Sequence, residues 1–319
     1  MTAAVTVDVA GGHMGGAARF RAEFYDYLAR SGRQDVKVIG DREHVNPSWL
    51  VRREVAGRGK TKRVAVNNVG FVAPGGERWT LLRNALHFLT EDEASHLEPS
   101  LITTVGRQAA VVRLAARRSD VVVVPCSSMA ERVAAVIPSL RRRVVVRPHP
   151  VSANSIPVLP RDPAILCPVL LESYKQMAER LADMLVAMDM YGDPSVRLRV
   201  TAGRAELPAS VANHPRVEPV GRLNYSKLRY IWGRSSAIFF PTGIESFGYP
   251  LAEARVSGHP VIGLDTAQNR EIAGAALCGF AANNPTSLCH AVKRALSAEV
   301  RPDPAPFDPS TYFCWLLGS

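Results

Sequence analysis

The chain has 319 residues, a length that suits two domains better than one. Hydrophobic residues make up 47% of it, and 39 Lys and Arg against 29 Asp and Glu give a net charge of +10. No run of 18 apolar residues occurs and the N-terminus lacks a signal-peptide pattern, which argues against a membrane-spanning or secreted protein. The five cysteines are scattered without metal or redox spacing, so we expect reduced thiols in a cytoplasmic protein.

The positive charge is concentrated in the first half of the chain. Residues 1–150 hold 23 basic and 14 acidic side chains, a balance of +9, with basic runs at Arg52-Arg53, Arg58 to Arg63 and Arg141 to Arg143. The interleaved aromatic residues or known modules of a nucleic-acid-binding protein are missing, so we expect no nucleic-acid partner. We interpret the runs as a solvated face and leave peripheral contact with an anionic membrane open.

The chain reads as strands alternating with helices. In the first half, strands are expected at 5–10, 36–40, 63–68, 80–88, 120–125 and 143–147, and helices at 17–30, 100–118 and 129–136. Five prolines in 148–163 indicate a linker.

The alternation then restarts, with strands expected at 164–168, 196–202, 217–220, 237–240 and 261–264. Helices are expected at 173–190, 225–231, 250–257 and 285–298. The tail from Arg301 has four prolines and then an apolar end, Tyr312 to Leu316, that needs a surface to pack on. The pattern predicts two α/β halves with parallel sheets, and ligands should bind at the carboxyl ends of their strands.

A glycine-rich loop follows the first expected strand. It reads Gly11-Gly12-His13-Met14-Gly15-Gly16 and leads into a helix, so its backbone can approach an anion closely. The spacing is not that of the dinucleotide-binding fingerprint, although Asp41 ends the second strand where a ribose-binding acid would lie. A nicotinamide-dependent oxidoreductase therefore stays as an alternative.

The strongest pointer to chemistry is the segment that contains Glu245 and Glu253. The first acid lies in a loop and the second on the helix that begins near Pro250, a residue suited to a first helical turn. We expect the diphosphate of an activated sugar at the N-terminus of this helix. Glu253 could then accept hydrogen bonds from ribose hydroxyls, and Glu245 could accept them from sugar hydroxyls near the reacting carbon.

Residues 239–262 resemble the signature of retaining nucleotide-sugar glycosyltransferases of family 4, which have the GT-B fold. The resemblance extends over nearly the whole chain and is specific in 217–274. It implies an α/β protein with two Rossmann-like domains facing across a cleft. Residues 1–155 would bind the acceptor, 156–302 would bind the nucleotide sugar, and 303–319 would cross back to the N-terminal domain.

The resemblance also implies residue roles. Glu245 would hold the donor sugar, Glu253 the donor ribose and Lys175 the diphosphate. The family arginine five or six residues before that lysine is replaced here by Leu170 or Val169. His87, at the end of the strand expected at 80–88, would lie beside the donor sugar, which makes Glu245 and His87 the candidate catalytic residues. The remaining donor-binding candidates are Gly15, Gly16, Val220, Gly221, Arg222, Ser246, Phe247, Gly248, Tyr249, Pro250 and Leu251.

By the same resemblance, the reaction would transfer a sugar from a UDP-, dTDP- or GDP-sugar to an acceptor hydroxyl with retention, without a metal or a cofactor. The acceptor would be a natural-product scaffold, or alternatively a lipid-linked or cell-envelope precursor at an anionic membrane. A non-catalytic nucleotide-sugar-binding protein is a further alternative, because the family arginine is replaced.

Overall fold

The computed structural model describes residues 4–13, 15–95, 97–168 and 175–318. The chain divides into two compact units. Unit 1 comprises Met1–Pro150, Glu245–Phe247 and Phe307–Ser319, and unit 2 comprises Val151–Ile244 and Gly248–Pro306. Unit 1 is thus built from three separate pieces of the chain.

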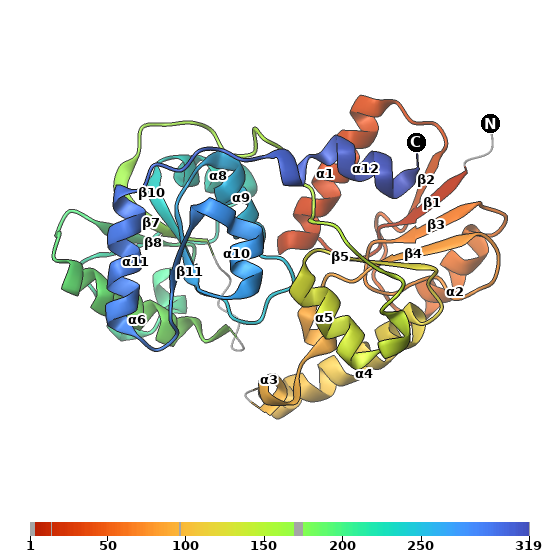
Figure 1. Ribbon diagram of the computed structural model, residues 1–319, viewed down its shortest axis with the longest axis horizontal. Helices are drawn as coiled ribbons and strands as arrows, with labels where there is room; N and C mark the ends of the chain where they lie inside the picture. The colour runs from red at the N-terminus through yellow and green to blue at the C-terminus, as the bar shows by residue number, and fades with distance from the viewer. Residues whose placement is uncertain (1–3, 14, 96, 169–174, 319) are drawn as a thin grey trace. The chain divides into compact units, whose positions relative to one another are not determined.

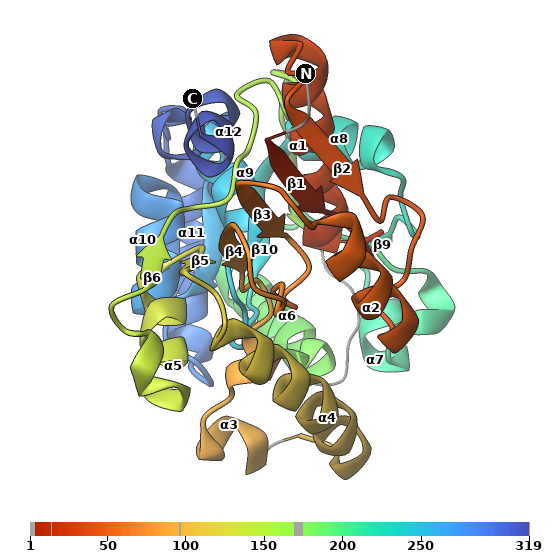
Figure 2. The ribbon, with the colours of Figure 1, turned by 90° about the vertical axis from the view of Figure 1, so that its right-hand side faces the viewer.

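Unit 1 contains a parallel sheet of six strands in the order β2-β1-β3-β4-β5-β6. Its central strands β1, β3 and β4 lie side by side in Figure 2. Val-rich strands that are buried on both faces are typical of such parallel sheets. The strands are β1 (Val5–Asp8), β2 (Val36–Ile39), β3 (Lys62–Ala65), β4 (Glu77–Leu81), β5 (Val121–Val124) and β6 (Val144–Val146).

The helices of unit 1 include one from the far end of the chain. Helix α12 lies against α1 (Figure 1), and the ring of Phe313 packs 5.6 Å from Phe20 and 5.4 Å from Phe24. The α-helices are α1 (Gly15–Ser31), α2 (Pro47–Ala56), α3 (Glu91–Ser95), α4 (Pro99–Ala116), α5 (Ser127–Val136) and α12 (Pro309–Leu317).

Unit 2 contains a second parallel sheet of six strands, in the order β12-β11-β10-β7-β8-β9. Helices α6 and α11 pack against each other beside this sheet. The strands are β7 (Asp162–Cys167), β8 (Arg197–Val200), β9 (Val217–Pro219), β10 (Ser235–Phe240), β11 (Val261–Leu264) and β12 (Leu277–Phe280). The α-helices are α6 (Met177–Tyr191), α7 (Ala209–Ala212), α8 (Tyr225–Gly233), α9 (Tyr249–Ser257), α10 (Ala267–Ala273) and α11 (Pro285–Ser297).

One expected strand was wrong over most of its length. Strand β4 ends at Leu81, and the chain then forms a 3-10 helix, η1 (Ala85–Phe88), in place of the strand expected at 80–88. The turn is set by Asn84, whose side chain accepts a hydrogen bond from the amide of Leu86 at 3.0 Å. Helices α2, α3, α7, α10 and α12 and strand β12 were not predicted.

The interpretation of the basic runs as a solvated face was wrong for two arginines. Arg53 is 1% exposed and donates to the equally buried Asp8 at 2.7 Å, and to the carbonyl oxygens of Val69 and Gly70. Arg63 is also buried and donates to a backbone carbonyl. Carboxylate and carbonyl oxygens replace the water that these guanidinium groups lose.

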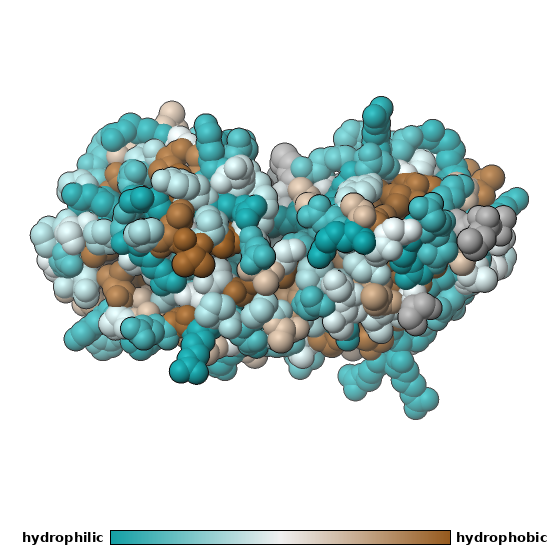
Figure 3. All heavy atoms as spheres, turned by 90° about the horizontal axis from the view of Figure 1, so that it is seen from above, coloured by the Kyte–Doolittle hydropathy of each residue, from teal (hydrophilic) through white to brown (hydrophobic). Residues whose placement is uncertain are grey.

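The described residues show no helix that is long and apolar enough to cross a membrane. On the face drawn in Figure 3, hydrophilic side chains predominate and apolar ones form small separate groups. All five cysteines are free thiols, and Cys126, Cys167 and Cys278 are buried.

Candidate functional site

The strand order of unit 2 places a ligand-binding position between β10 and β7. Strands β10, β11 and β12 follow one another to one side, and β7, β8 and β9 to the other. Connections from adjacent strands therefore diverge between β10 and β7, and open α/β sheets bind ligands at such a point, at the carboxyl ends of the strands. The loop that leaves β10 leads into α9, and the chain that leaves β7 leads to Lys175.

Helix α9 begins with a backbone that only glycine adopts readily. Gly248 has φ of 78°, and a Cβ there would lie 2.9 Å from Leu251 Cδ1 and 3.1 Å from Phe240 Cε1. Pro250 in the first turn has no N–H, and the amides of Leu251 and Ala252 donate to the Gly248 carbonyl. An anion at this end of α9 would thus be held by few helix amides together with the positive end of the helix dipole.

Glu253 is the buried acid of this site. It is 1% exposed, on the second turn of α9. The hydroxyl of Tyr225, the first residue of α8, donates to Glu253 Oε1 at 3.5 Å. The side chain of Tyr225 is itself 41% exposed, so it connects the buried carboxylate to the surface of unit 2.

Of the three candidates after β9, Val220 and Gly221 are held by their backbone. The amide of Val220 donates to Val200 at 2.9 Å and that of Gly221 donates to Ala202 at 3.1 Å. The guanidinium of Arg222 is 78% exposed and pairs with Glu206 at 2.6 Å. Arg222 therefore carries a partner of its own here.

Lys175 lies just before α6 and is partly buried. Val169 and Leu170, the positions that would carry the family arginine, lie outside the described residues.

Glu245, Ser246 and Phe247 belong to unit 1 by their contacts. The Ser246 hydroxyl donates to the carbonyl of Arg83 at 2.6 Å, and the Cys126 thiol donates to the carbonyl of Ser246 at 3.2 Å. The ring of Phe247 lies 5.0 Å from that of His149. Glu245 is partly buried and accepts from the amide of Ser246 at 3.1 Å.

Unit 1 has a cavity of about 100 Å³, lined by both polar and apolar residues, at the carboxyl ends of β1 and β3. These strands are neighbours, and their following connections diverge as they do in unit 2. Gly15 and Gly16 form the first residues of α1, which follows the glycine loop. The cavity is lined by Val9, Ala10, Gly11, Gly12, Ala17, Arg21, Val45, Val66, Asn67, Asn68 and Arg83.

Asp41 is engaged by two side chains of α1. Arg21 donates to its carboxylate at 2.8 Å, and the hydroxyl of Tyr25 donates to the same oxygen. These contacts hold the pKa of Asp41 below its usual value, chiefly through the hydrogen bond from Tyr25. If Asp41 bound a ribose, its carboxylate would have to accept hydrogen bonds from the ribose hydroxyls as well as from Arg21 and Tyr25.

His87 lies in η1 and not at the end of a strand, which corrects the expected local structure. It is 5% exposed, and its carbonyl accepts from Arg113 of α4 at 2.9 Å. Burial lowers the pKa of its imidazole, and the charge of Arg113 lowers it further. His87 is therefore a buried ring in a 3-10 helix that packs against α4.

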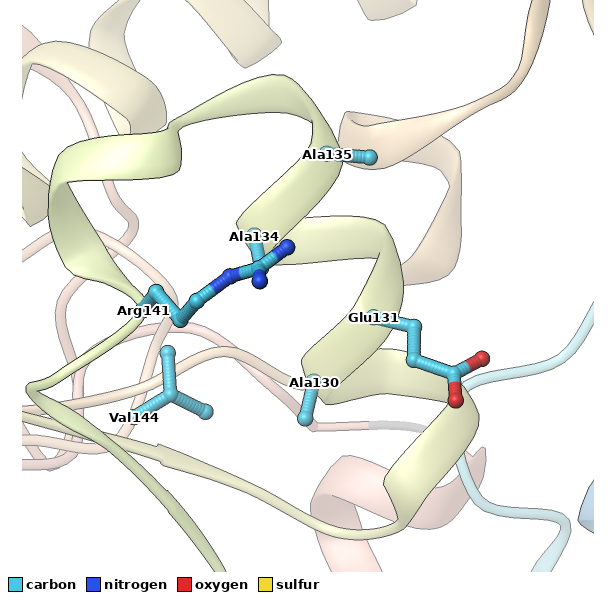
Figure 4. A pocket seen from close by; sticks show the side chains of 6 residues that line it. All are labelled: Ala130, Glu131, Ala134, Ala135, Arg141 and Val144. Carbon is cyan, nitrogen blue, oxygen red and sulfur yellow. The ribbon is translucent and has the colours of Figure 1, made fainter.

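A larger surface hollow of about 390 Å³ lies between α5 and β6 (Figure 4). The side chain of Arg141 extends toward Ala134, while the carboxylate of Glu131 points to the other side of the helix. Polar groups do not converge there, as they usually do in a ligand site. Its lining is Ala130, Glu131, Ala134, Ala135, Arg141 and Val144.

Several residues of these sites were missed from the sequence. Tyr225, Cys126 and Arg83 have no local pattern that sets them apart. Asn67 and Asn68 did offer a signal, because two polar residues follow the apolar run from Val64 to Val66 at the carboxyl edge of the sheet.

No family model matches the sequence, and no curated protein matches it as a relative. Solved structures do resemble it. WaaG, a glycosyltransferase involved in lipopolysaccharide biosynthesis, aligns over 99% of this chain and 100% of its own, with a TM-score of 0.66 and 12% identity. AviGT4, a glycosyltransferase involved in avilamycin A biosynthesis, aligns over 99% and 98%, with a TM-score of 0.62 and 15% identity. HepE of Anabaena, in complex with UDP, aligns over 98% of each chain, with a TM-score of 0.63 and 12% identity. The chain thus has the GT-B fold, with two Rossmann-like α/β units, as the sequence predicted.

Proposed function

We propose that the protein is a retaining, metal-independent glycosyltransferase that uses a nucleoside diphosphate sugar. One observation carries the proposal: a buried carboxylate, Glu253, on the helix that follows β10 at the point where the connections of unit 2 diverge. The similarity in fold to WaaG, AviGT4 and the UDP complex of HepE supports it.

Unit 2 would bind the nucleotide part of the donor. Glu253 would accept hydrogen bonds from the ribose hydroxyls. Tyr225 would give up its hydrogen bond to Glu253, which would leave that carboxylate oxygen available to the ribose. Lys175 and the positive end of α9 would stabilise the charge that develops on the departing diphosphate. Gly248 would let the backbone approach the diphosphate closely because it has no side chain.

The transfer would break the bond between the anomeric carbon and the diphosphate and form a bond from that carbon to the acceptor oxygen on the same face. The acceptor proton would pass to the leaving phosphate, so the reaction needs no side chain as general base. The transition state would resemble an oxocarbenium ion. Glu245 would hold the sugar hydroxyls in the orientation that this path requires.

The acceptor would bind at the cavity of unit 1, where amide and guanidinium groups can meet hydroxyl groups. A natural-product scaffold is favoured by the similarity to AviGT4. A lipid-linked envelope precursor at an anionic membrane is the second candidate, favoured by the similarity to WaaG and by the +9 balance of residues 1–150. Sedimentation with anionic vesicles at low salt separates the two, because only the second predicts binding.

The first test is a thermal-shift panel of UDP, dTDP, GDP and NADH with wild-type protein, Glu253→Gln and the control Glu299→Gln. A nucleoside diphosphate at 100 times its Kd should stabilise wild-type protein by about 2.7 kcal/mol. Loss of the charge-assisted hydrogen bonds in Glu253→Gln should weaken binding by roughly 10- to 100-fold, while the exposed Glu299 should have no effect. A shift with NADH alone would instead favour an oxidoreductase.

The second test concerns catalysis. Glu245→Ala should lower the release of nucleoside diphosphate from its sugar by orders of magnitude and leave the circular dichroism spectrum unchanged. Binding of a sugar nucleotide without any turnover in the wild-type protein would leave only a non-catalytic binding protein.

A further inference from the structure

We propose that Cys126 and Ser246 position Glu245 for the transfer, an inference that rests on the proposed function. Four groups from three residues form what we call the Ser246 clasp: the thiol of Cys126, the hydroxyl and the carbonyl of Ser246, and the carbonyl of Arg83. Cys126 and Arg83 lie far from the Glu245 segment in the sequence, and all of these groups belong to unit 1.

The clasp holds Ser246 by both its side chain and its backbone. The hydroxyl donates to the Arg83 carbonyl at 2.6 Å, a short hydrogen bond, and the carbonyl accepts from the Cys126 thiol at 3.2 Å. Ser246 is 6% exposed and Cys126 is fully buried, so water is poorly placed to replace either contact. The residue directly before this fixed point is Glu245.

The clasp is connected to the cavity of unit 1. The amide of Arg83 donates to the side-chain oxygen of Asn68 at 2.5 Å, and both residues line the cavity. The guanidinium of Arg83 lies 4.6 Å from the ring of Phe20 on α1, which fixes its direction. A displacement of Ser246 would therefore reach the groups proposed to bind the acceptor.

Aromatic packing supports the same segment from its other end. The ring of Phe247 contacts His149 at 5.0 Å and Phe307 at 6.1 Å, both edge-on. These aromatic contacts hold Phe247 in unit 1. The backbone next to Glu245 is held instead by the hydrogen bonds of the Ser246 carbonyl and hydroxyl. A single substitution in the Ser246 clasp can therefore loosen this segment without removing an aromatic ring from the core.

The clasp and the nucleotide-binding residues should respond differently to substitution. Glu253 lies on α9 in unit 2, whereas Cys126 and Ser246 lie in unit 1. A displacement of about 1 Å at a reacting group can lower the rate about 100-fold. Loosening the clasp should therefore lower kcat and leave nucleotide affinity unchanged.

The experiment compares Cys126→Ala, Cys126→Ser and Ser246→Ala with the matched control Cys278→Ala, which removes another buried thiol. We expect kcat for donor turnover to fall about 10- to 100-fold in Cys126→Ala and Ser246→Ala. In Cys126→Ala the Kd for the nucleoside diphosphate should stay within about twofold of wild type. Cys126→Ser keeps a donor at the same position and should recover most of the loss. Cys278→Ala should keep the wild-type kcat.

Hydrogen exchange gives a readout that does not depend on turnover. Peptides that contain Ser246 and Phe247 should exchange faster in Cys126→Ala than in Cys126→Ser, while peptides from β1 and β10 stay unchanged. Equal exchange in both variants would overturn the clasp, whether or not the protein is active. An active wild type with unchanged kcat in Cys126→Ala would overturn it as well. An inactive wild type that binds no nucleoside diphosphate would instead overturn the proposed function.

Discussion

Acidification should destabilise the fold through His259, which follows α9 after the single residue Gly258. Its ring is buried, and the Ser257 hydroxyl lies 2.9 Å from its Nδ1. The same hydroxyl donates to the carbonyl of Glu253 at 2.6 Å, so the histidine is linked to the helix that carries the proposed ribose-binding acid. Burial, aided by the charge of Arg161, lowers the pKa of His259 from 6.5 to about 4.

Whether acid lowers or raises the free energy of unfolding depends on whether the unfolded or the folded chain binds a proton at the higher pH. Between pH 6.5 and about 4 the unfolded chain protonates this histidine while the folded chain does not. The free energy of unfolding therefore falls as the pH is lowered through that window. One pKa unit corresponds to about 1.4 kcal/mol, so the loss should be about 2 kcal/mol at pH 5 and about 3 kcal/mol at pH 4.

Urea unfolding at several pH values, followed by circular dichroism, measures this loss. His259→Asn removes the titrating ring, so the stability difference between wild type and variant should shrink by about 2 kcal/mol from pH 7 to pH 5. His290→Asn changes an exposed histidine of the same unit and serves as the control. Curves for wild type and His259→Asn that stay parallel across the window would refute the reasoning.

Two further substitutions test other parts of the structure. Gly248→Ala places a side chain on a residue with positive φ and against Leu251. Urea unfolding should show a loss of about 1–3 kcal/mol in the free energy of unfolding, and calorimetry should show weaker binding of UDP. Wild-type values for both would contradict the account of this turn. Arg53→Met leaves the carboxylate of Asp8 buried without its guanidinium partner and should cost about 3–5 kcal/mol, whereas adding Asp8→Leu should recover part of that loss in the same assay.

Local signals predicted much of the fold. The alternation of apolar runs with amphipathic segments located most strands of both sheets, and Pro250 marked the start of α9 because its effect on a first helical turn is local. A similar signal was overlooked at α2, where the Asn46 side chain caps the helix and Pro47 begins it. The strand expected at 80–88 was too long because one side chain, that of Asn84, turns the backbone after β4.

The tertiary contacts of the site could not be predicted in the same way. The carboxylate of Asp8 and the guanidinium of Arg53 are 45 residues apart in the chain, and a run of arginines says nothing about which of them meets a buried acid. The contact of Ser246 with Cys126 spans 120 residues. Such pairs follow from how the elements pack, and no local periodicity records them.

The order of synthesis has a consequence for unit 1. Rings on α1 and on α12 cover one another, and Arg33 donates to the carbonyl of Gly318 at 2.5 Å. A nascent chain must therefore keep the aromatic face of its first helix uncovered until more than 300 residues have been translated. During that interval the ribosome-bound intermediate exposes an apolar surface to chaperones. A frameshift near the 3′ end of the message would remove α12 and leave that surface permanently exposed.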